Sequence, residues 1–146
     1  MHRIALPAFA LTCVVASAPA DARDDRLRFP VADALATADA REKLDPAIKL
    51  YFGAQKHPKP VKSFGTDTTN KKTNFLNKED KEGCEWVFLP ALHQLQSHAR
   101  KLGANGVVNI ASVYRGANLE SETEYECGAG TFIGGVALRG ELVKLP

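Results

Sequence analysis

The sequence has little net charge, few cysteines and none of the short motifs that mark nucleotide chemistry. Its 146 residues include 19 Lys and Arg against 17 Asp and Glu, which gives a net charge of +2. Nucleic-acid-binding domains usually show a strong basic excess, so we expect no nucleic-acid partner. Hydrophobic residues make up 45% of the chain and charged residues 25%, ordinary values for one globular domain. This composition argues against a disordered chain and against a bundle of membrane helices.

Motifs of known enzyme classes are also missing. Glycines occur between positions 134 and 140 with the spacing of a phosphate-binding loop, but Glu141 stands where that loop requires Lys. The sequence contains no Gly-x-Ser-x-Gly, His-Glu-x-x-His or Cys-x-x-Cys. His93 and His98 would point about 140° apart on a helix, so they are poorly placed to share a metal. We therefore predict no catalytic residue, no cofactor and no enzyme activity.

The first 22 residues have the pattern of a secretory signal peptide. Arg3 supplies a positive charge, residues 4–18 are uncharged and mostly apolar, and small residues allow cleavage after Ala20 or Ala22. The apolar run is shorter than the roughly 20 residues needed to cross a bilayer. We expect export to the bacterial periplasm, with a signal peptide at 1–22, a single domain at 23–146 and no transmembrane helix after cleavage.

The three cysteines divide into one expected in the signal peptide and two in the domain. Cys13 follows Leu11 and Thr12, whereas the acylated Cys of a lipoprotein normally follows a small residue, so we expect no lipid anchor there. Cys84 and Cys127 are left, and two cysteines in an exported domain indicate one disulfide. Two buried free thiols are the alternative. Neither Cys has a Cys or His two to four positions away, which disfavours a zinc site.

Hydrophobic periodicity predicts an α+β domain with the order β-β-α-β-β. Alternating apolar residues over 48–52 and the Val-, Phe- and Thr-containing stretch 61–70 predict two strands, which we expect to form a hairpin. The Ala-rich stretch 34–44 predicts a short helix that ends before Pro46. The highly charged stretch 71–83 predicts a solvated loop.

The main helix is predicted over residues 86–102 and is expected to pack on one face of the sheet. Its buried face should consist of apolar residues at three- and four-residue steps: Phe88, Leu92, Leu95, Ala99 and Leu102. Pro90 is tolerated in the first turn of a helix, so we place it there. Strands follow over 106–114 and 122–145, and the second should be broken by a bulge or bend near Gly134 and Gly135.

Charged side chains offer two weaker candidate sites. If residues 120–126 form a strand, one face would carry four glutamates, which are Glu120, Glu122, Glu124 and Glu126. Hard cations bind carboxylate oxygens, but a solvated strand face explains the pattern equally, and we predict no metal site. Seven lysines could mark an anionic partner or simply a solubilising surface: Lys56, Lys59, Lys62, Lys71, Lys72, Lys78 and Lys81.

The stretch 99–108 joins the predicted helix to the next strand and carries a family resemblance. Its sequence, Ala-Arg-Lys-Leu-Gly-Ala-Asn-Gly-Val-Val, resembles the junction in YbjQ-like "heavy-metal-binding" domains and in the periplasmic core of the Rcs envelope-stress sensor lipoprotein. Similarity to the sensor extends to Cys84 and to the run 127–130. The segments 84–86 and 125–130 are also similar to small exported proteobacterial proteins of unknown function.

The resemblance covers residues 84–145 and implies a small sheet with one helix packed across it. Its signature residues are Gly103, Ala104, Asn105 and Gly106, which specify a fold junction and no catalytic site. It also supports a disulfide between Cys84 and Cys127. The sensor has two bridges and a lipid anchor, whereas this domain has two cysteines, so a signalling role does not transfer directly.

These features together predict a periplasmic binding or envelope-sensing module without catalysis. Its partner would be an envelope protein or a small ligand, and a homo-oligomer is compatible with the sequence. Two other functions stay open, which are divalent-cation binding by the glutamates of 120–126 and an enzyme activity of unknown type.

Overall fold

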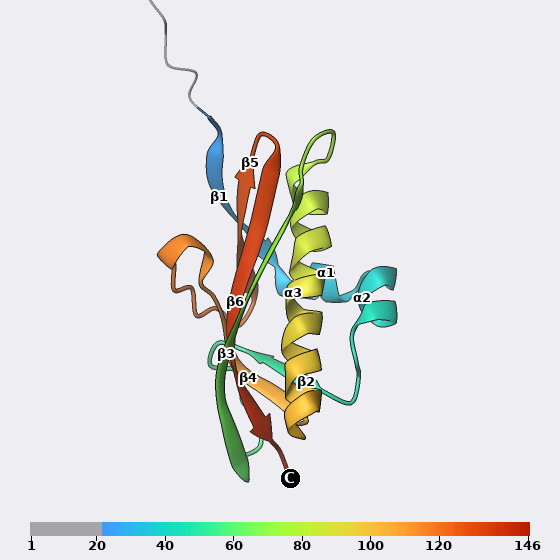
Figure 1. Cartoon of the computed structure of the whole chain (residues 1–146), viewed down its shortest axis with the longest axis vertical. Coiled ribbons are helices and arrows are strands. Elements are labelled where there is room, and N and C mark those ends of the chain that lie inside the picture. The colour runs from blue at the N-terminus through green and yellow to red at the C-terminus, as the bar shows by residue number, and fades with distance from the viewer. Residues whose placement is uncertain (1–21) are drawn as a thin grey trace, which may run out of the picture.

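A six-stranded curled sheet with one long helix on one face makes up residues 22–146, the part of the chain that the computed structural model describes (Figure 1). The predicted signal peptide, Cys13 included, lies outside these residues except for Ala22. The elements are β1 (Asp24–Pro30), α1 (Val31–Leu35), α2 (Ala38–Lys43), β2 (Lys49–Phe52), β3 (Lys62–Asn74), α3 (Asp80–Leu102), β4 (Gly106–Ser112), a 3-10 turn (Tyr114–Gly116), β5 (Glu124–Gly130) and β6 (Ile133–Lys144). The predicted α+β class with one main helix is confirmed.

Strand β6 is the centre of the sheet and has partners on both edges. One edge pairs antiparallel with β3 along its whole length. The other edge pairs with β5 near Gly135 and with β4 between Leu138 and Val143. Strand β1 extends the sheet beyond β5, and β2 extends it beyond β4. Two separate two-stranded ribbons, β1–β5 and β4–β2, are therefore joined through β6.

The predicted hairpin between residues 48–52 and 61–70 is wrong. β2 pairs in parallel with β4, beginning with Lys49 opposite Gly106, whereas β3 pairs antiparallel with β6. Alternating apolar residues identify a strand, but they do not identify its partner when that partner is far away in the sequence. β1, at the sheet edge, was not predicted at all.

The break predicted at Gly134 and Gly135 lies three residues earlier, at Thr131 and Phe132. The paired glycines instead leave room for aromatic rings. A Cβ on Gly135 would lie 2.8 Å from Cε2 of Tyr114, and one on Gly134 would lie 2.2 Å from Cζ of Phe75. Adjacent strand residues point to opposite faces, so the two rings pack on opposite sides of β6.

Helix α3 begins at Asp80, six residues before the predicted start. The predicted loop 71–83 is therefore wrong, because β3 continues to Asn74 and the acidic residues after it form the first helical turn, where the helix dipole favours them. Pro90 consequently lies inside α3 and not in its first turn. Leu102, expected in the core, is 50% exposed at the C-terminal end of the helix.

The Ala-rich stretch 34–44 forms parts of two short helices instead of one. Helix α1 ends at Leu35, and Thr37 caps α2 by accepting a hydrogen bond from the Ala40 backbone N–H at 3.1 Å. The core between α3 and the sheet contains Phe88, Leu92, Leu95 and Ala99 as predicted. Among residues 22–146, no helix is long and apolar enough to cross a membrane.

Candidate functional site

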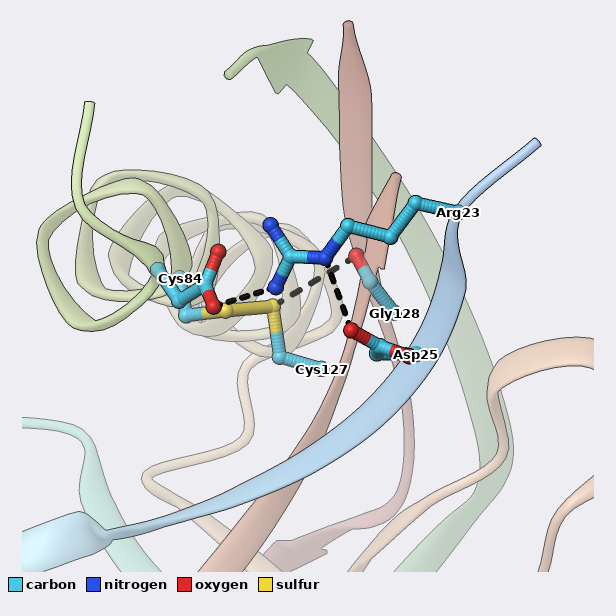
Figure 2. A network of polar contacts seen from close by, with 6 residues as sticks. Arg23, Asp25, Cys84, Cys127 and Gly128 are labelled. Atoms are coloured by element: carbon cyan, nitrogen blue, oxygen red, sulfur yellow. Dashed lines mark hydrogen bonds and ion pairs between the residues drawn. A yellow bond between two sulfur atoms is a disulfide. The ribbon is translucent and has the colours of Figure 1, made fainter. Parts of the chain in front are cut away.

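Cys84 and Cys127 form the predicted disulfide, which joins the N-terminal part of α3 to β5 (Figure 2). Their Cα atoms are 5.9 Å apart, and both side chains are completely buried. Cys127 therefore faces the helix side of the sheet, as expected from strand alternation, while Glu126 beside it faces the other side. A buried bridge in this position fixes helix against sheet and has no access for a redox partner.

Arg23 lies over the disulfide and ties β1 to α3 (Figure 2). Its guanidinium pairs with Asp80 in the first turn of α3 and with Asp25 at 2.7 Å. The carboxylate of Asp80, followed by that of Asp25, raises the pKa of Arg23 above its usual value. These groups are partly exposed, so the network contributes little to stability.

The signature residues at 103–106 build the junction that the resemblance implies. Gly103 has φ +81°, the left-handed conformation that ends a helix, and Ala104 is buried. Asn105 clamps the C-terminal segment, since its Nδ2 donates to the Leu145 carbonyl at 3.2 Å and its Oδ1 accepts from the Leu145 N–H at 2.6 Å. A Cβ on Gly106 would lie 2.8 Å from Cδ1 of Leu145. This site is structural.

The four candidate glutamates do not share one strand face. Glu120 and Glu122 precede β5, Glu124 is exposed at its start, and Glu126 is buried. Glu126 forms an ion pair with Arg26 at 3.3 Å, whereas Glu120 forms one with Arg139 at 3.6 Å. Within the described range 22–146, no three His, Cys, Asp or Glu side chains are grouped so that they could hold a metal ion.

A polar pocket of about 330 Å³ lies on the face of the sheet opposite α3. Arg139, Glu141 and Glu120 line it, together with Asn109. Arg139 donates to Asn118 at 2.8 Å and pairs with Glu120, while Glu141 accepts from Ser63 at 2.7 Å and from Asn109 at 3.4 Å. Arg139 and Glu120 therefore pair with each other, and Glu141 is hydrogen-bonded to two neutral side chains.

A second pocket, here called the α3 groove, lies between β3 and the C-terminal end of α3 and has a volume of about 340 Å³. Its apolar surface comes from Phe64, Leu102 and the buried Leu142 of β6. The bulge of β3 between Ser63 and Thr66 brings Phe64 to this position. The remaining lining residues are Gly65, Thr66, Asp67, His98 and Lys101.

His98 and Asp67 form the polar pair of the α3 groove. Nδ1 of His98 is hydrogen-bonded to Oδ2 of Asp67, and both side chains are partly buried. Both side chains also line the α3 groove. Sequence reasoning treated His98 as a surface residue and did not single out Asp67, because only the packing of α3 on β3 brings them together.

His57 and His93 do not line this groove. His93 is exposed on α3, and the ring of His57 lies 5.4 Å from that of Tyr51. His93 and His98 therefore do not converge, in agreement with their five-residue spacing.

Comparison with protein-family models, curated proteins and solved structures gives no match for this chain. The family resemblance rests on the residues of its signature alone.

Proposed function

We propose that this protein is an exported, non-catalytic binding module of the bacterial cell envelope and that the α3 groove holds its ligand. The observation that carries the proposal is the His98–Asp67 pair at the edge of an apolar groove. Small-molecule sites typically combine apolar walls with a few oriented polar groups. The polar pocket on the opposite face is less suited, because no large apolar side chain lines it.

The lining of the α3 groove favours a small amphiphile with an anionic head. Phe64, Leu102 and Leu142 would contact the apolar body. Lys101 supplies a positive charge at the rim, and Asp67 is already engaged by His98. The groove therefore offers donors and positive charge beside its apolar surface.

Export is supported by the predicted signal peptide and by the disulfide. Disulfides persist in oxidising compartments such as the bacterial periplasm and are rare in the cytosol. An envelope-sensing role would follow if occupancy of the groove changed the binding of an envelope protein.

Isothermal titration with dodecanoate, below its micelle concentration, tests the site. Leu102→Asp places a carboxylate in the groove and should weaken dodecanoate binding at least tenfold. Lys101→Gln removes the rim charge and should weaken it about three- to tenfold. His93→Gln changes an exposed residue of the same helix outside the groove and should leave the affinity unchanged.

Two results would contradict the proposed site. One is the absence of dodecanoate binding to the unmodified protein. The other is binding that Leu102→Asp leaves intact but that Phe132→Ser, at the far end of the molecule, abolishes. Circular dichroism of each variant serves as the check that it is folded like the parent.

A further inference from the structure

Two charged side chains of β6 line the polar pocket on the face opposite α3 without pairing with each other. Arg139 and Glu141 are alternate residues of the strand, so they project from the same face, with Cα atoms about 7 Å apart. No ion pair joins them within residues 22–146. The pocket, with a volume of about 330 Å³, therefore presents a separate positive and negative group on one strand.

Arg139 keeps much of its hydrogen-bonding capacity open. Its Nη2 donates to Asn118 at 2.8 Å and lies 3.6 Å from a carboxylate oxygen of Glu120, too far for a hydrogen bond. Its Nε and Nη1 have no partner in the described part of the chain. A guanidinium with open N–H groups suits a carboxylate, which it can bind through two parallel hydrogen bonds.

Glu141 carries a negative charge that no cation within residues 22–146 neutralises. Its carboxylate accepts from the Ser63 hydroxyl at 2.7 Å and from the Asn109 amide at 3.4 Å, and both donors are neutral. The charged side chains that line the pocket are Glu120, Arg139 and Glu141, so the lining has one negative charge more than positive. A ligand that brings a positive group to Glu141 would compensate this charge.

The sheet is irregular on both sides of Glu141. The bulge of β3 lies between Ser63 and Thr66, and Thr66 is the β3 residue opposite Glu141. On the other side, β4 departs from regular pairing directly after Val108, which is also opposite Glu141. Asn109 follows with φ +53°, a conformation that is uncommon for residues other than glycine. Bulges re-aim side chains and are frequent beside functional sites, and here two of them flank one carboxylate.

We infer that the polar pocket binds a small α-amino acid as its zwitterion, with the ammonium group at Glu141 and the carboxylate at Arg139. Both charged groups of such a ligand are attached to the same carbon atom, so one molecule contacts both side chains. The rest of the lining is small or polar and favours a small polar ligand side chain, as in serine; it comprises Gly53, Ala54, Thr66, Asn109 and Gly140 beside Glu120. This inference does not depend on the ligand of the α3 groove.

The experiment is an NMR titration of the protein in the form that cells accumulate, followed through its backbone amide signals. L-serine should shift the signals of Asn109, Gly140 and Glu141 in a saturable way and leave that of Lys101, in the α3 groove, in place. Two analogues each lack one charge. N-acetyl-L-serine has no ammonium group and L-serine amide has no carboxylate, and each should bind at least about tenfold more weakly than L-serine.

Matched variants locate the two charged contacts. Arg139→Gln and Glu141→Gln should each weaken L-serine binding at least about tenfold. Arg28→Gln on β1 and Glu42→Gln on α2 are the controls, because both residues are exposed and neither lines the pocket. They make the same changes of charge and should leave the affinity for L-serine unchanged. The amide spectrum of each variant shows whether it is folded like the parent.

The inference is overturned if L-serine shifts none of the pocket signals of the parent protein. It is equally overturned if either analogue binds as well as L-serine, since the pocket would then recognise a single charge. Binding that persists unchanged in folded Arg139→Gln or Glu141→Gln would place the ligand elsewhere.

Discussion

The ring of Phe88 lies flat against the ring of Tyr125, with centroids 3.8 Å apart and planes inclined by 10°. This stack joins the middle of α3 to β5, close to the disulfide that links the same two elements. The Tyr125 hydroxyl has no hydrogen-bond partner within residues 22–146. Burial, with the nearby charges of Glu85 and Asp33, raises the pKa of Tyr125 above its usual value.

The stack should stabilise the folded state through the packing of its two rings and not through the Tyr125 hydroxyl. Phe88→Ala should lower the free energy of unfolding by about 3–5 kcal/mol, because it leaves a cavity in the core. Tyr125→Phe removes an unpaired buried hydroxyl and should leave stability unchanged or raise it by about 1 kcal/mol. Urea denaturation measures both. A loss above about 1 kcal/mol for Tyr125→Phe would show that the hydroxyl has a partner after all.

The disulfide should stabilise the domain by lowering the conformational entropy of the unfolded chain. Cys84 and Cys127 are 43 positions apart, and closing a loop of that length corresponds to about 4 kcal/mol in the chain-entropy model. The double variant Cys84→Ala, Cys127→Ala should lose about 3–4 kcal/mol in urea denaturation. Adding a reductant should destabilise the parent and leave this variant unaffected. Non-reducing peptide mapping that finds two free thiols would contradict the pairing in the cell.

Gly128 should tolerate no side chain, because a Cβ there would lie 2.0 Å from Cε1 of Tyr114. Gly128→Ala should cost about 1–3 kcal/mol as the ring is forced away. In a Tyr114→Ala background the same substitution should cost much less, and thermal denaturation of the four proteins gives this coupling. Strict additivity would mean that Tyr114 does not occupy this position in solution.

Asp45 should make stability depend on pH in the acid range. Its carboxylate pairs with Arg100, which lowers the pKa of Asp45 below its ordinary value of 3.8, and the Ala47 N–H adds to the effect. The folded state therefore keeps Asp45 ionised at a lower pH than the unfolded chain does. This stabilisation is complete above the ordinary pKa and is lost as pH falls through the folded value.

The comparison of the parent with Arg100→Gln isolates that contribution. The parent should be the more stable of the two at pH 7, and the difference should shrink as the pH falls below about 4 in urea denaturation. Lys101, the next residue, has no ion pair within residues 22–146. The difference in stability between the parent and Lys101→Gln should therefore not change with pH. A parent advantage that persists at pH 2 would rule out the Asp45 pair as its source.

The sequence revealed best those features that are local. Periodicity predicts the C-terminal part of α3 and the strand that follows it. The left-handed conformation that Gly103 readily adopts predicts where the helix ends. The disulfide followed from the number of cysteines expected after export. Each of these conclusions needs only neighbouring residues or a simple count.

The features that were missed depend on distant partners. Leu27 and Phe29 are the residues of β1 that pack against the core. The charged residues before and between them conceal a strand until β5 is beside it. The pair of Asp67 and His98 joins residues 31 positions apart and exists only because α3 crosses β3 at that point. No spacing rule within a single sequence contains that information.

The position of β6 in the chain has a consequence for biogenesis. β3, β4 and β5 all precede it, yet each relies on it for hydrogen bonds. Until residues 133–144 have left the ribosome, the sheet has no centre and the earlier strands cannot close a core. A nascent chain that lacks residues 133–144 therefore stays open, and the domain can fold only after β6 has been synthesised.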